Sequence, residues 1–397
     1  MEKSLNIIKS GNINFPLEDY ISAEKFKKIK EFSKTHETPF LIIDLERINE
    51  NYEELSTNLP FAKIYYAVKS NSSIEVLSLL RNLGSSFDVA SIYELDLVLS
   101  LGVSPSKISY GNTIKKATHV KHAYEKGINL FATDSIEDLI NISKNAPGAK
   151  VFFRILTDNS SADWPLSKKF GTHLDLAYDL AVKAKELGLI PYGMSFHVGS
   201  QQKDVGQWED AIAKCSSIFK LLKENGIELK MINLGGGFPS RYNYVINKSS
   251  EYCTEIAKYL HDYFGKDLPE VIIEPGRSMV GNSGVIVSEI VLISKKNKID
   301  KLNWVYLDIG KFGGLIETLD ESIKYPIFIE KKGTPREVIL AGPTCDSMDI
   351  LYENYKYKLP STIKIKDKVY IFTTGAYTQS YSSICFNGFP PLKSYIL

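Results

Sequence analysis

Three glycine-containing segments of the sequence carry residue types that suit the binding of an anion. They are HVGS (197–200), LGGGFP (234–239) and EPGR (274–277). Successive glycines let backbone N–H groups approach a ligand closely, and Arg277 adds a positive charge. One glycine run predicts a tight turn as readily as a ligand site, but three such segments at late strand ends favour a phosphate cradle. No Walker lysine motif follows the glycines, which argues against a nucleoside triphosphate.

Lys69 and Glu274 are the ionisable residues that extend this interpretation. Lys69 ends the apolar segment IYYAVK (64–69), where a desolvated amine would be a nucleophile that attacks carbonyl groups. A buried Glu274 needs a cationic partner, and a protonated pyridine nitrogen is one. Each residue alone is also explained by a structural ion pair, Lys69 with Asp88 and Glu274 with Arg277. Together with the phosphate cradle, the amine and the acid match pyridoxal 5'-phosphate.

Short apolar segments alternate with amphipathic helical stretches from Ile64 to about Arg277, which is typical of a parallel sheet built from βα units. Eight such units favour a closed (β/α)8 TIM-like barrel, whose chemistry lies at the C-terminal strand ends. The expected strands are 64–69, 86–91, 107–112, 130–134, 150–156, 192–200, 229–237 and 270–277. They end, or nearly end, on Lys69, Asp88, Asn112, Asp134, Arg154, His197, the run Gly235–Gly237 and the segment Glu274–Arg277.

After Arg277 the pattern changes to apolar strand segments without long helices between them. Clear examples are GVIVSEIVLIS (284–294), NWVYLDIG (303–310) and KVYIFTTGAY (368–377). We therefore expect two domains in this α/β chain. A (β/α)8 barrel covers residues 37–277, and residues 1–36 and 278–397 form a mainly antiparallel β domain.

The composition excludes several classes of function. The 397 residues carry 48 basic and 47 acidic side chains, so no charge pattern for nucleic acid or membrane binding is visible. The expected partners are small molecules and copies of the same chain. The four cysteines lack metal-ligand spacing, which predicts no metal site and a reducing, cytoplasmic setting. The first 15 residues lack a signal-peptide pattern, and no long apolar run follows.

An ordered set of motifs resembles the alanine-racemase-like, group IV (fold type III) pyridoxal-phosphate decarboxylases, and among them the bacterial ornithine decarboxylases. The motifs are YYAVKSN, SFDVAS, HVGSQQ, NLGGGFP, EPGRS, GPTCDSMD and GAYT. The resemblance covers the chain from about residue 37 to the C-terminus. It implies the decarboxylation of L-ornithine to putrescine and CO2, a reaction of polyamine biosynthesis.

The resemblance implies a role for each residue of the expected barrel site. Lys69 matches the lysine that binds the cofactor covalently, His197 matches the imidazole that stacks on its ring, and Glu274 matches the carboxylate at the pyridine nitrogen. Asp88 and Arg154 match positions near the ring and its hydroxyl group. The phosphate-binding positions are matched by Ser200, Gly235, Gly236, Gly237, Gly276, Arg277 and Tyr377.

The segment GPTCDSMD (342–349) belongs to the expected β domain. Its residue types predict a turn with Asx-type hydrogen bonding. By resemblance, Cys345 returns a proton to the substrate α-carbon, and Asp346 and Asp320 bind the distal ammonium of a diamino acid. In the family the residues that match Cys345 and Asp346 reach the active site of the neighbouring subunit, which implies an obligate homodimer with shared active sites. Lys169 and Asp349 match an interface ion pair.

The substrate has two candidates. Family members that act on diaminopimelate place a glutamate after the cysteine, whereas this chain has Asp346. L-Ornithine and L-lysine both present a terminal ammonium, and their difference of one methylene gives only about 1–3 kcal/mol of discrimination. The segment 310–326, with Phe312 in place of an interface tyrosine, is of the bacterial type, which includes enzymes acting on both. A lysine/ornithine decarboxylase that gives cadaverine therefore remains an alternative.

Three further alternatives fit the sequence less well. Racemases of this fold place an arginine at the pyridine nitrogen, where this chain has Glu274. A non-catalytic carrier of the cofactor would lack the β domain with Cys345 and Asp346. A regulatory binding protein derived from a decarboxylase would not need to keep Lys69 and Cys345.

Overall fold

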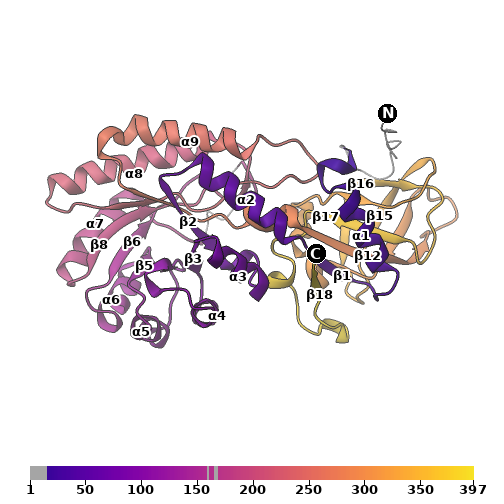
Figure 1. Cartoon of the computed structure of the whole chain (residues 1–397), viewed down its shortest axis with the longest axis horizontal. Helices are drawn as coiled ribbons and strands as arrows, with labels where there is room; N and C mark the ends of the chain where they lie inside the picture. The colour runs from indigo at the N-terminus through magenta and orange to yellow at the C-terminus, as the bar shows by residue number, and fades with distance from the viewer. Residues whose placement is uncertain (1–15, 159–160, 165–168) are drawn as a thin grey trace. The chain divides into compact units, whose positions relative to one another are not determined.

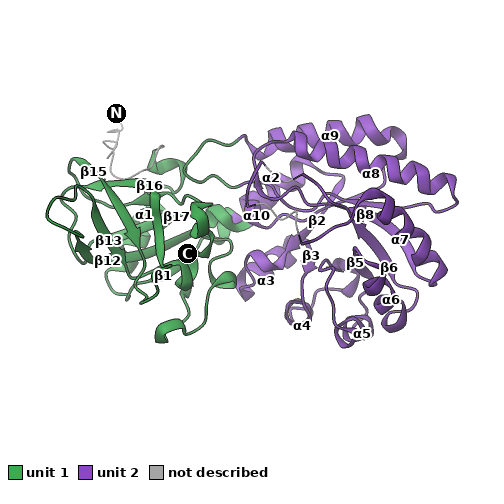
Figure 2. Cartoon of the chain, turned by 180° about the vertical axis from the view of Figure 1, so that it is seen from behind, with its two compact units in different colours: residues 1–47, 240–246, 280–397 green, residues 48–239, 247–279 purple. Residues whose placement is uncertain are grey.

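The computed structural model describes residues 16–158, 161–164 and 169–397. The chain divides into two compact units, which are coloured separately in Figure 2. Unit 1 takes residues 1–47, 240–246 and 280–397, and unit 2 takes residues 48–239 and 247–279.

Unit 2 contains a closed barrel of eight strands in the order β10-β11-β2-β3-β4-β5-β6-β8. All neighbouring strands in it are parallel. The strands are β2 (Ala62–Ala67), β3 (Ser86–Val89), β4 (Ile108–Tyr110), β5 (Leu130–Thr133), β6 (Lys150–Arg154), β8 (Ile190–Ser195), β10 (Met231–Asn233) and β11 (Glu270–Ile273). Each strand overlaps its expected segment, so the prediction of a (β/α)8 barrel is confirmed.

Helix α2 precedes the first barrel strand, and the other helices of this part of the chain come after barrel strands (Figure 1). The helices are α2 (Leu45–Asn58), α3 (Ile74–Asn82), α4 (Ile92–Ser100), α5 (Ala117–Glu125), α6 (Ile136–Asn145), α7 (Leu174–Glu186), α8 (Gly206–Glu224), α9 (Ser249–Phe264) and the short α10 (Arg277–Val280). Serine side chains begin two of them, because Ser91 accepts from the amide of Glu94 and Ser135 from that of Asp138. Within the described ranges, no helix combines the length and apolar character needed to cross a membrane.

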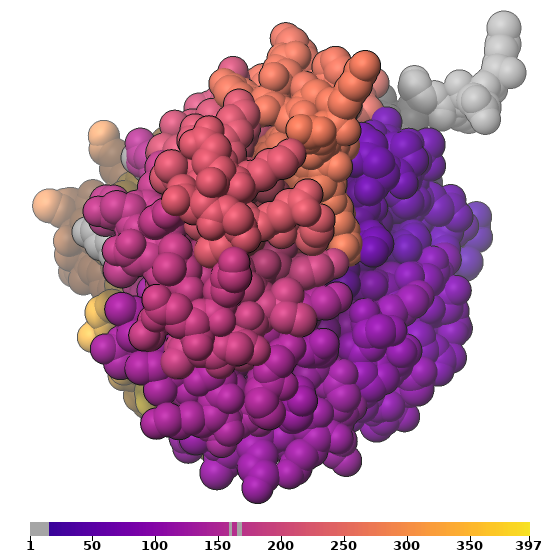
Figure 3. Space-filling model, turned by 90° about the vertical axis from the view of Figure 1, so that its left-hand side faces the viewer, coloured from indigo at the N-terminus to yellow at the C-terminus, as the bar shows by residue number. Residues whose placement is uncertain are grey.

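Pairing of the last barrel strand with the first closes the barrel. Ile273 of β11 lies opposite Ile64 of β2. On the surface of unit 2, an early part of the chain in violet lies beside a late part in orange (Figure 3). Since all strands point the same way, the residues that follow β2, β3, β6, β8, β10 and β11 gather at one edge of the barrel.

Unit 1 contains a sheet of eight strands. Its central path is β14-β17-β12-β13-β15-β16, and β1 pairs with β12 and β18. The strands are β1 (Phe40–Ile43), β12 (Gly284–Ser294), β13 (Asn303–Leu307), β14 (Ile327–Phe328), β15 (Pro335–Ala341), β16 (Ile350–Pro360), β17 (Lys368–Phe372) and β18 (Lys393–Ile396). Only β1 with β18 and β13 with β15 are parallel, which confirms a mainly antiparallel β domain.

The observed boundary between the units differs from the expected one at residue 37. Residues 37–47 fall in unit 1, because β1 pairs with β12 and β18 through its backbone. Residues 240–246 also belong to unit 1, although we expected the whole span 37–277 to form the barrel. The first 15 residues of the expected β domain lie outside the described part of the chain.

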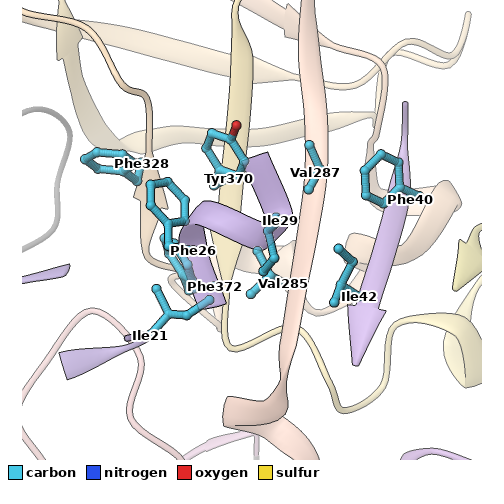
Figure 4. Close-up of a cluster of buried hydrophobic side chains, with 10 residues drawn as sticks. All are labelled: Ile21, Phe26, Ile29, Phe40, Ile42, Val285, Val287, Phe328, Tyr370 and Phe372. Carbon is cyan, nitrogen blue, oxygen red and sulfur yellow. The ribbon is translucent and has the colours of Figure 1, made fainter. Parts of the chain in front are cut away.

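The core of unit 1 forms where helix α1 (Ala23–Ser33) packs on the sheet (Figure 4). Phe26 of α1 is 5% exposed and makes edge-on ring contacts with Tyr370 at 4.9 Å and Phe328 at 5.6 Å between centroids. Such contacts add about 0.5–1.5 kcal/mol to the burial of the rings themselves. Phe26 therefore links the N-terminal helix to strands from the far end of the chain.

Replacing Phe26 by alanine is expected to destabilise unit 1 by about 3–5 kcal/mol, because the substitution leaves a cavity and removes the ring contacts. The urea concentration at the unfolding midpoint measures the loss. Ile299→Ala is the matched control, since Ile299 is 89% exposed and its truncation should cost less than about 0.5 kcal/mol. Equal midpoints for the two variants would contradict the assigned core.

Candidate active site

Lys69 lies just beyond the end of β2, in the 3-10 helix Val68–Ser70. Its Nζ is 3.8 Å from Oδ2 of Asp88, and its side chain is 42% exposed. The expectation of a desolvated amine is therefore wrong for the described chain. The strand is buried, whereas Lys69 in the turn that follows it is exposed and has Asp88 as an ionic partner.

Asp88 is buried within β3 and is 4% exposed. Burial raises the pKa of its carboxyl group well above the ordinary value, and the nearby Glu274 raises it further. Lys69 and a hydrogen bond from Ser109 Oγ, at 2.9 Å, act in the opposite direction. Gly111 is packed so closely that a Cβ there would overlap the Asp88 carboxylate.

His197 follows β8 by two residues and is held as a neutral ring. Burial lowers the pKa of its imidazole well below 6.5, and the positive charges of Arg154 and Lys69 lower it further. Nδ1 accepts a hydrogen bond from the amide of Gly199 at 3.1 Å. In a neutral imidazole the remaining proton is then on Nε2.

The glycine run 235–237 follows β10 and leaves no room for side chains. A Cβ at Gly235 would overlap the carbonyl oxygen of Phe196, and one at Gly236 would lie 2.7 Å from that of Glu274. Gly235 and Gly237 have φ values of 64° and 100°, which disfavour residues with a Cβ. Glycine is therefore required here by the close packing of this run against the residues that follow β8 and β11.

Arg277 begins α10 and is 3% exposed. Its Nε and Nη2 both donate to Ser200 Oγ at 3.1 Å. Ser200 opens the short strand β9 (Ser200–Gln202), which pairs with β7 (Ala162–Trp164). The structure thus places a buried guanidinium and a hydroxyl group side by side, a pairing that suits a phosphate ligand.

Glu274 follows β11 and is oriented by Asn233. Its Oε1 accepts a hydrogen bond from Asn233 Nδ2 at 2.5 Å. The other end of the same amide, Asn233 Oδ1, accepts from the amide of Gly235 at 2.9 Å. Asn233 is 1% exposed, so it links the carboxylate to the glycine run from a fixed position. The sequence interpretation missed this residue, although it directly precedes the glycine segment.

The remaining polar strand ends have different roles. Arg154 ends β6, and its guanidinium lies 5.0 Å from the ring centroid of Phe170. Burial lowers the pKa of Arg154, but an arginine starts so high that it stays charged. Asn112 accepts from the amide of Ile114 at 3.1 Å, and Asp134 accepts from that of Gly171 at 2.8 Å. Asn112 and Asp134 therefore stabilise loops, and these hydrogen bonds account for a polar residue at each position without a catalytic role.

Glu94 is a second residue of this edge that the sequence interpretation missed. Its Oε2 accepts from the amide of Ala90 at 2.7 Å, while Ser91 Oγ caps the amide of Glu94 at 3.3 Å. Burial raises the pKa of the Glu94 carboxyl group, and the charge of Lys69 opposes the rise. The pattern Ser-x-x-Glu is a helix-start signal that identifies this position from the sequence.

Cys345 and Asp346 lie in unit 1, on the loop between β15 and β16. Cys345 is exposed and free, and its amide donates to Asn387 Oδ1 at 3.0 Å. Asp346 Oδ1 accepts from the amide of Met348 at 2.8 Å, which confirms the predicted Asx turn. Asp349 closes the loop.

The Asp349 carboxylate is 2% exposed and accepts three hydrogen bonds. They come from the amide of Lys311 at 2.8 Å and from the amide and hydroxyl of Thr344 at 3.1 and 2.7 Å. Its pairing with Lys169 stays a prediction. Asp320, with an exposed side chain, and Tyr377 also belong to unit 1.

The barrel residues fit pyridoxal 5'-phosphate. Glycine backbone without room for a Cβ, together with Arg277 and Ser200, suits the phosphate. Glu274 suits a protonated ring nitrogen, and Lys69 suits the aldehyde. No cluster of three or more His, Cys, Asp or Glu side chains suited to a metal ion occurs in residues 16–158, 161–164 and 169–397.

Comparison with known families gives a match over the barrel. The model of the family described as "Pyridoxal-dependent decarboxylase, pyridoxal binding domain" matches residues 45–281. Among curated relatives, the lysine/ornithine decarboxylase of Selenomonas ruminantium is 34% identical over 363 residues, which cover 91% of this chain and 90% of that protein.

Solved structures give the same result for the fold. A lysine decarboxylase from Selenomonas ruminantium is similar with a TM-score of 0.86 and 33% identity, over 95% of this chain and 96% of that one. A lysine/ornithine decarboxylase from Vibrio vulnificus in complex with putrescine has a TM-score of 0.85 and 28% identity, over 95% of this chain and 99% of that one. The similarity therefore extends over both units.

The imidazole of His197 is expected to stay neutral at pH values where an ordinary histidine is half protonated. Its folded pKa lies below 6.5, so between the two values the unfolded chain binds a proton that the folded chain does not, and acidification costs stability. NMR of 13C-labelled histidine, assigned with a His197→Gln variant, measures the midpoint. A midpoint at or above about 6.5 would contradict the burial of the ring.

Proposed function

The chain belongs to the pyridoxal-dependent decarboxylases, and on that premise we propose that it converts L-ornithine to putrescine and CO2, a reaction of polyamine biosynthesis. The observation that supports this choice of substrate is that Cys345 and Asp346 are adjacent on one hydrogen-bonded loop of unit 1. The exposed Asp320 belongs to the same unit. Two carboxylates suit a substrate with a distal ammonium.

The barrel residues would hold the cofactor at three points. Arg277, Ser200 and the glycine backbone bind the phosphate, and Lys69 binds at the aldehyde carbon. Glu274, oriented by Asn233, keeps a proton on the ring nitrogen. When bound, pyridoxal phosphate would supply an electron sink for the electron pair that stays on the substrate α-carbon when CO2 leaves. By resemblance to the family, the neutral His197 would stack on the ring and limit its tilt.

The unit 1 residues would act on the substrate. Asp320 and Asp346 bind the distal ammonium and so fix the distance from that end to the α-carbon. Cys345 then gives a proton to the α-carbon after CO2 has left. The relative from Vibrio vulnificus is described as bound to putrescine, which is the product that we propose for this chain.

L-Lysine is the second candidate substrate. Two relatives are named lysine/ornithine decarboxylases, and a structure of the one from Vibrio vulnificus is described as a complex with cadaverine. An extra methylene changes binding by only about 1–3 kcal/mol in an apolar pocket. We therefore propose ornithine as the main substrate and lysine as the alternative.

We also propose that the active site is completed by a second copy of the chain. Cys345 is exposed on unit 1, whereas Lys69 and Glu274 belong to unit 2. By resemblance to the family, Cys345 and Asp346 would serve the barrel of the partner subunit, while Tyr377 would add to the phosphate site. A homodimer with two shared sites follows from this arrangement.

Purified protein loaded with pyridoxal phosphate should release CO2 from L-ornithine or L-lysine with kcat/KM at least about tenfold above that for L-arginine or diaminopimelate, because those substrates lack a simple terminal ammonium or add a second carboxylate. Measurement of CO2 and of the released diamine tests this preference. Lys69→Ala, which lacks the lysine that would bind the cofactor, is the inactive control. Preferred release from diaminopimelate would contradict the proposed pocket.

Mixing two inactive variants is expected to restore activity if the sites are shared. Lys69→Ala damages the barrel side, and Cys345→Ala damages the side offered by the partner. In a random mixture half of the dimers are mixed, and each mixed dimer has one intact site, so about a quarter of wild-type activity should return. Activity no higher than the average of the two separate variants would contradict shared sites.

A further inference from the structure

Two acidic residues stand side by side in the segment Ile316–Glu321, and the structure separates their roles. We infer that Glu321 is a positioning residue that holds the neighbouring Asp320 in place as the acceptor for the distal ammonium of the substrate. This inference deepens the proposed function and depends on it. Every contact that carries it lies within unit 1.

The carboxylate of Glu321 is engaged by the backbone of β16. Oε1 accepts from the amides of Glu353 at 2.7 Å and Asn354 at 2.6 Å, and Oε2 accepts from the amide of Tyr355 at 2.7 Å. Burial alone would raise the pKa of Glu321, but the three amide donors outweigh it and hold the pKa below its usual range. An ionised carboxylate therefore ties the end of the segment to the strand.

The backbone at Asp320 and Glu321 has an unfavourable conformation that requires stabilising contacts. Asp320 and Glu321 have φ values of 51° and 53°, in the left-handed region that residues with a Cβ disfavour. Two consecutive left-handed residues persist only where neighbouring contacts fix them. The amide of Ser322 donates to the Leu319 carbonyl oxygen at 3.1 Å, and Lys324 Nζ donates to that of Glu321 at 2.6 Å. Glu321 thus stabilises the turn whose exposed residue is Asp320.

This geometry assigns the ammonium to Asp320 rather than to Glu321. Both oxygens of Glu321 already accept strong hydrogen bonds from β16, and exchanging them for a ligand would leave three amides to be satisfied elsewhere. The side chain of Asp320 is exposed and open to a ligand. The sequence Leu319-Asp320-Glu321-Ser322 contains two carboxylates, and only the fold distinguishes them.

The test is steady-state kinetics of the cofactor-loaded enzyme with L-ornithine and L-lysine. Glu321→Gln keeps the size but places an amide NH2 against a backbone donor, so KM for both substrates should rise roughly tenfold while kcat changes less than about twofold. Glu321→Asp, which keeps the charge at a shorter reach, should give a smaller rise. Glu353→Gln removes an exposed carboxylate from the same strand and is the matched control, with KM unchanged.

A double variant separates positioning from a general structural effect. In an Asp320→Asn background, which itself should raise KM, Glu321→Gln should add nothing, because its effect passes through Asp320. Three results would overturn the inference: additive increases in KM, a loss of kcat without a change in KM, or wild-type KM in both Glu321 variants. None of them affects the proposed function as long as the wild type turns over ornithine. If Glu321→Gln does not fold, Glu321→Asp is measured instead, alone and in the Asp320→Asn background, and the same outcomes apply. A wild-type enzyme that decarboxylates neither substrate overturns both.

Discussion

Closure of the parallel barrel between β11 and β2 is the constraint on which the candidate site depends. Lys69 and Glu274 are far apart in the sequence, but the amide of Ala67 donates to the Pro275 carbonyl oxygen at 3.2 Å and joins the two strand ends. A Cβ at Gly276 would lie 3.3 Å from the Cβ of Ala67, so the two backbones are nearly in contact. Backbone packing alone therefore fixes the position of Lys69, which would bind the aldehyde, relative to Glu274, which would bind the ring nitrogen.

Burial then decides the charge that each side chain carries. Burial and the nearby Glu274 raise the pKa of Asp88, an effect that Lys69 and Ser109 oppose, while Glu274 accepts a hydrogen bond from Asn233. His197, beside positive charges, stays neutral. The edge of the barrel thus combines an anionic group for the ring nitrogen with a cationic group for the phosphate. Unit 1 supplies exposed groups of another kind, a thiol and carboxylates on loops that internal hydrogen bonds hold in shape.

The sequence predicted the barrel well because apolar strand segments and polar strand ends repeat eight times. It failed where short-range backbone geometry decides. Lys69 is exposed because a 3-10 turn follows the strand. Asn233 and Glu94 act through side-chain bonds to backbone amides, which no spacing rule for catalysis detects. Strand β16 was missed although tyrosines alternate with charged residues along it. The different roles of Asp320 and Glu321 could be assigned only from the folded structure.

We propose above all that one barrel edge binds pyridoxal phosphate through Lys69. Borohydride reduction of the cofactor-loaded protein, followed by peptide mapping with mass spectrometry, tests it most directly, since reduction makes the bond between lysine and cofactor permanent. We expect a pyridoxyl group on Nζ of Lys69 in the peptide that contains IYYAVKSN. Stoichiometric labelling of a different lysine, with Lys69 unmodified, would contradict it.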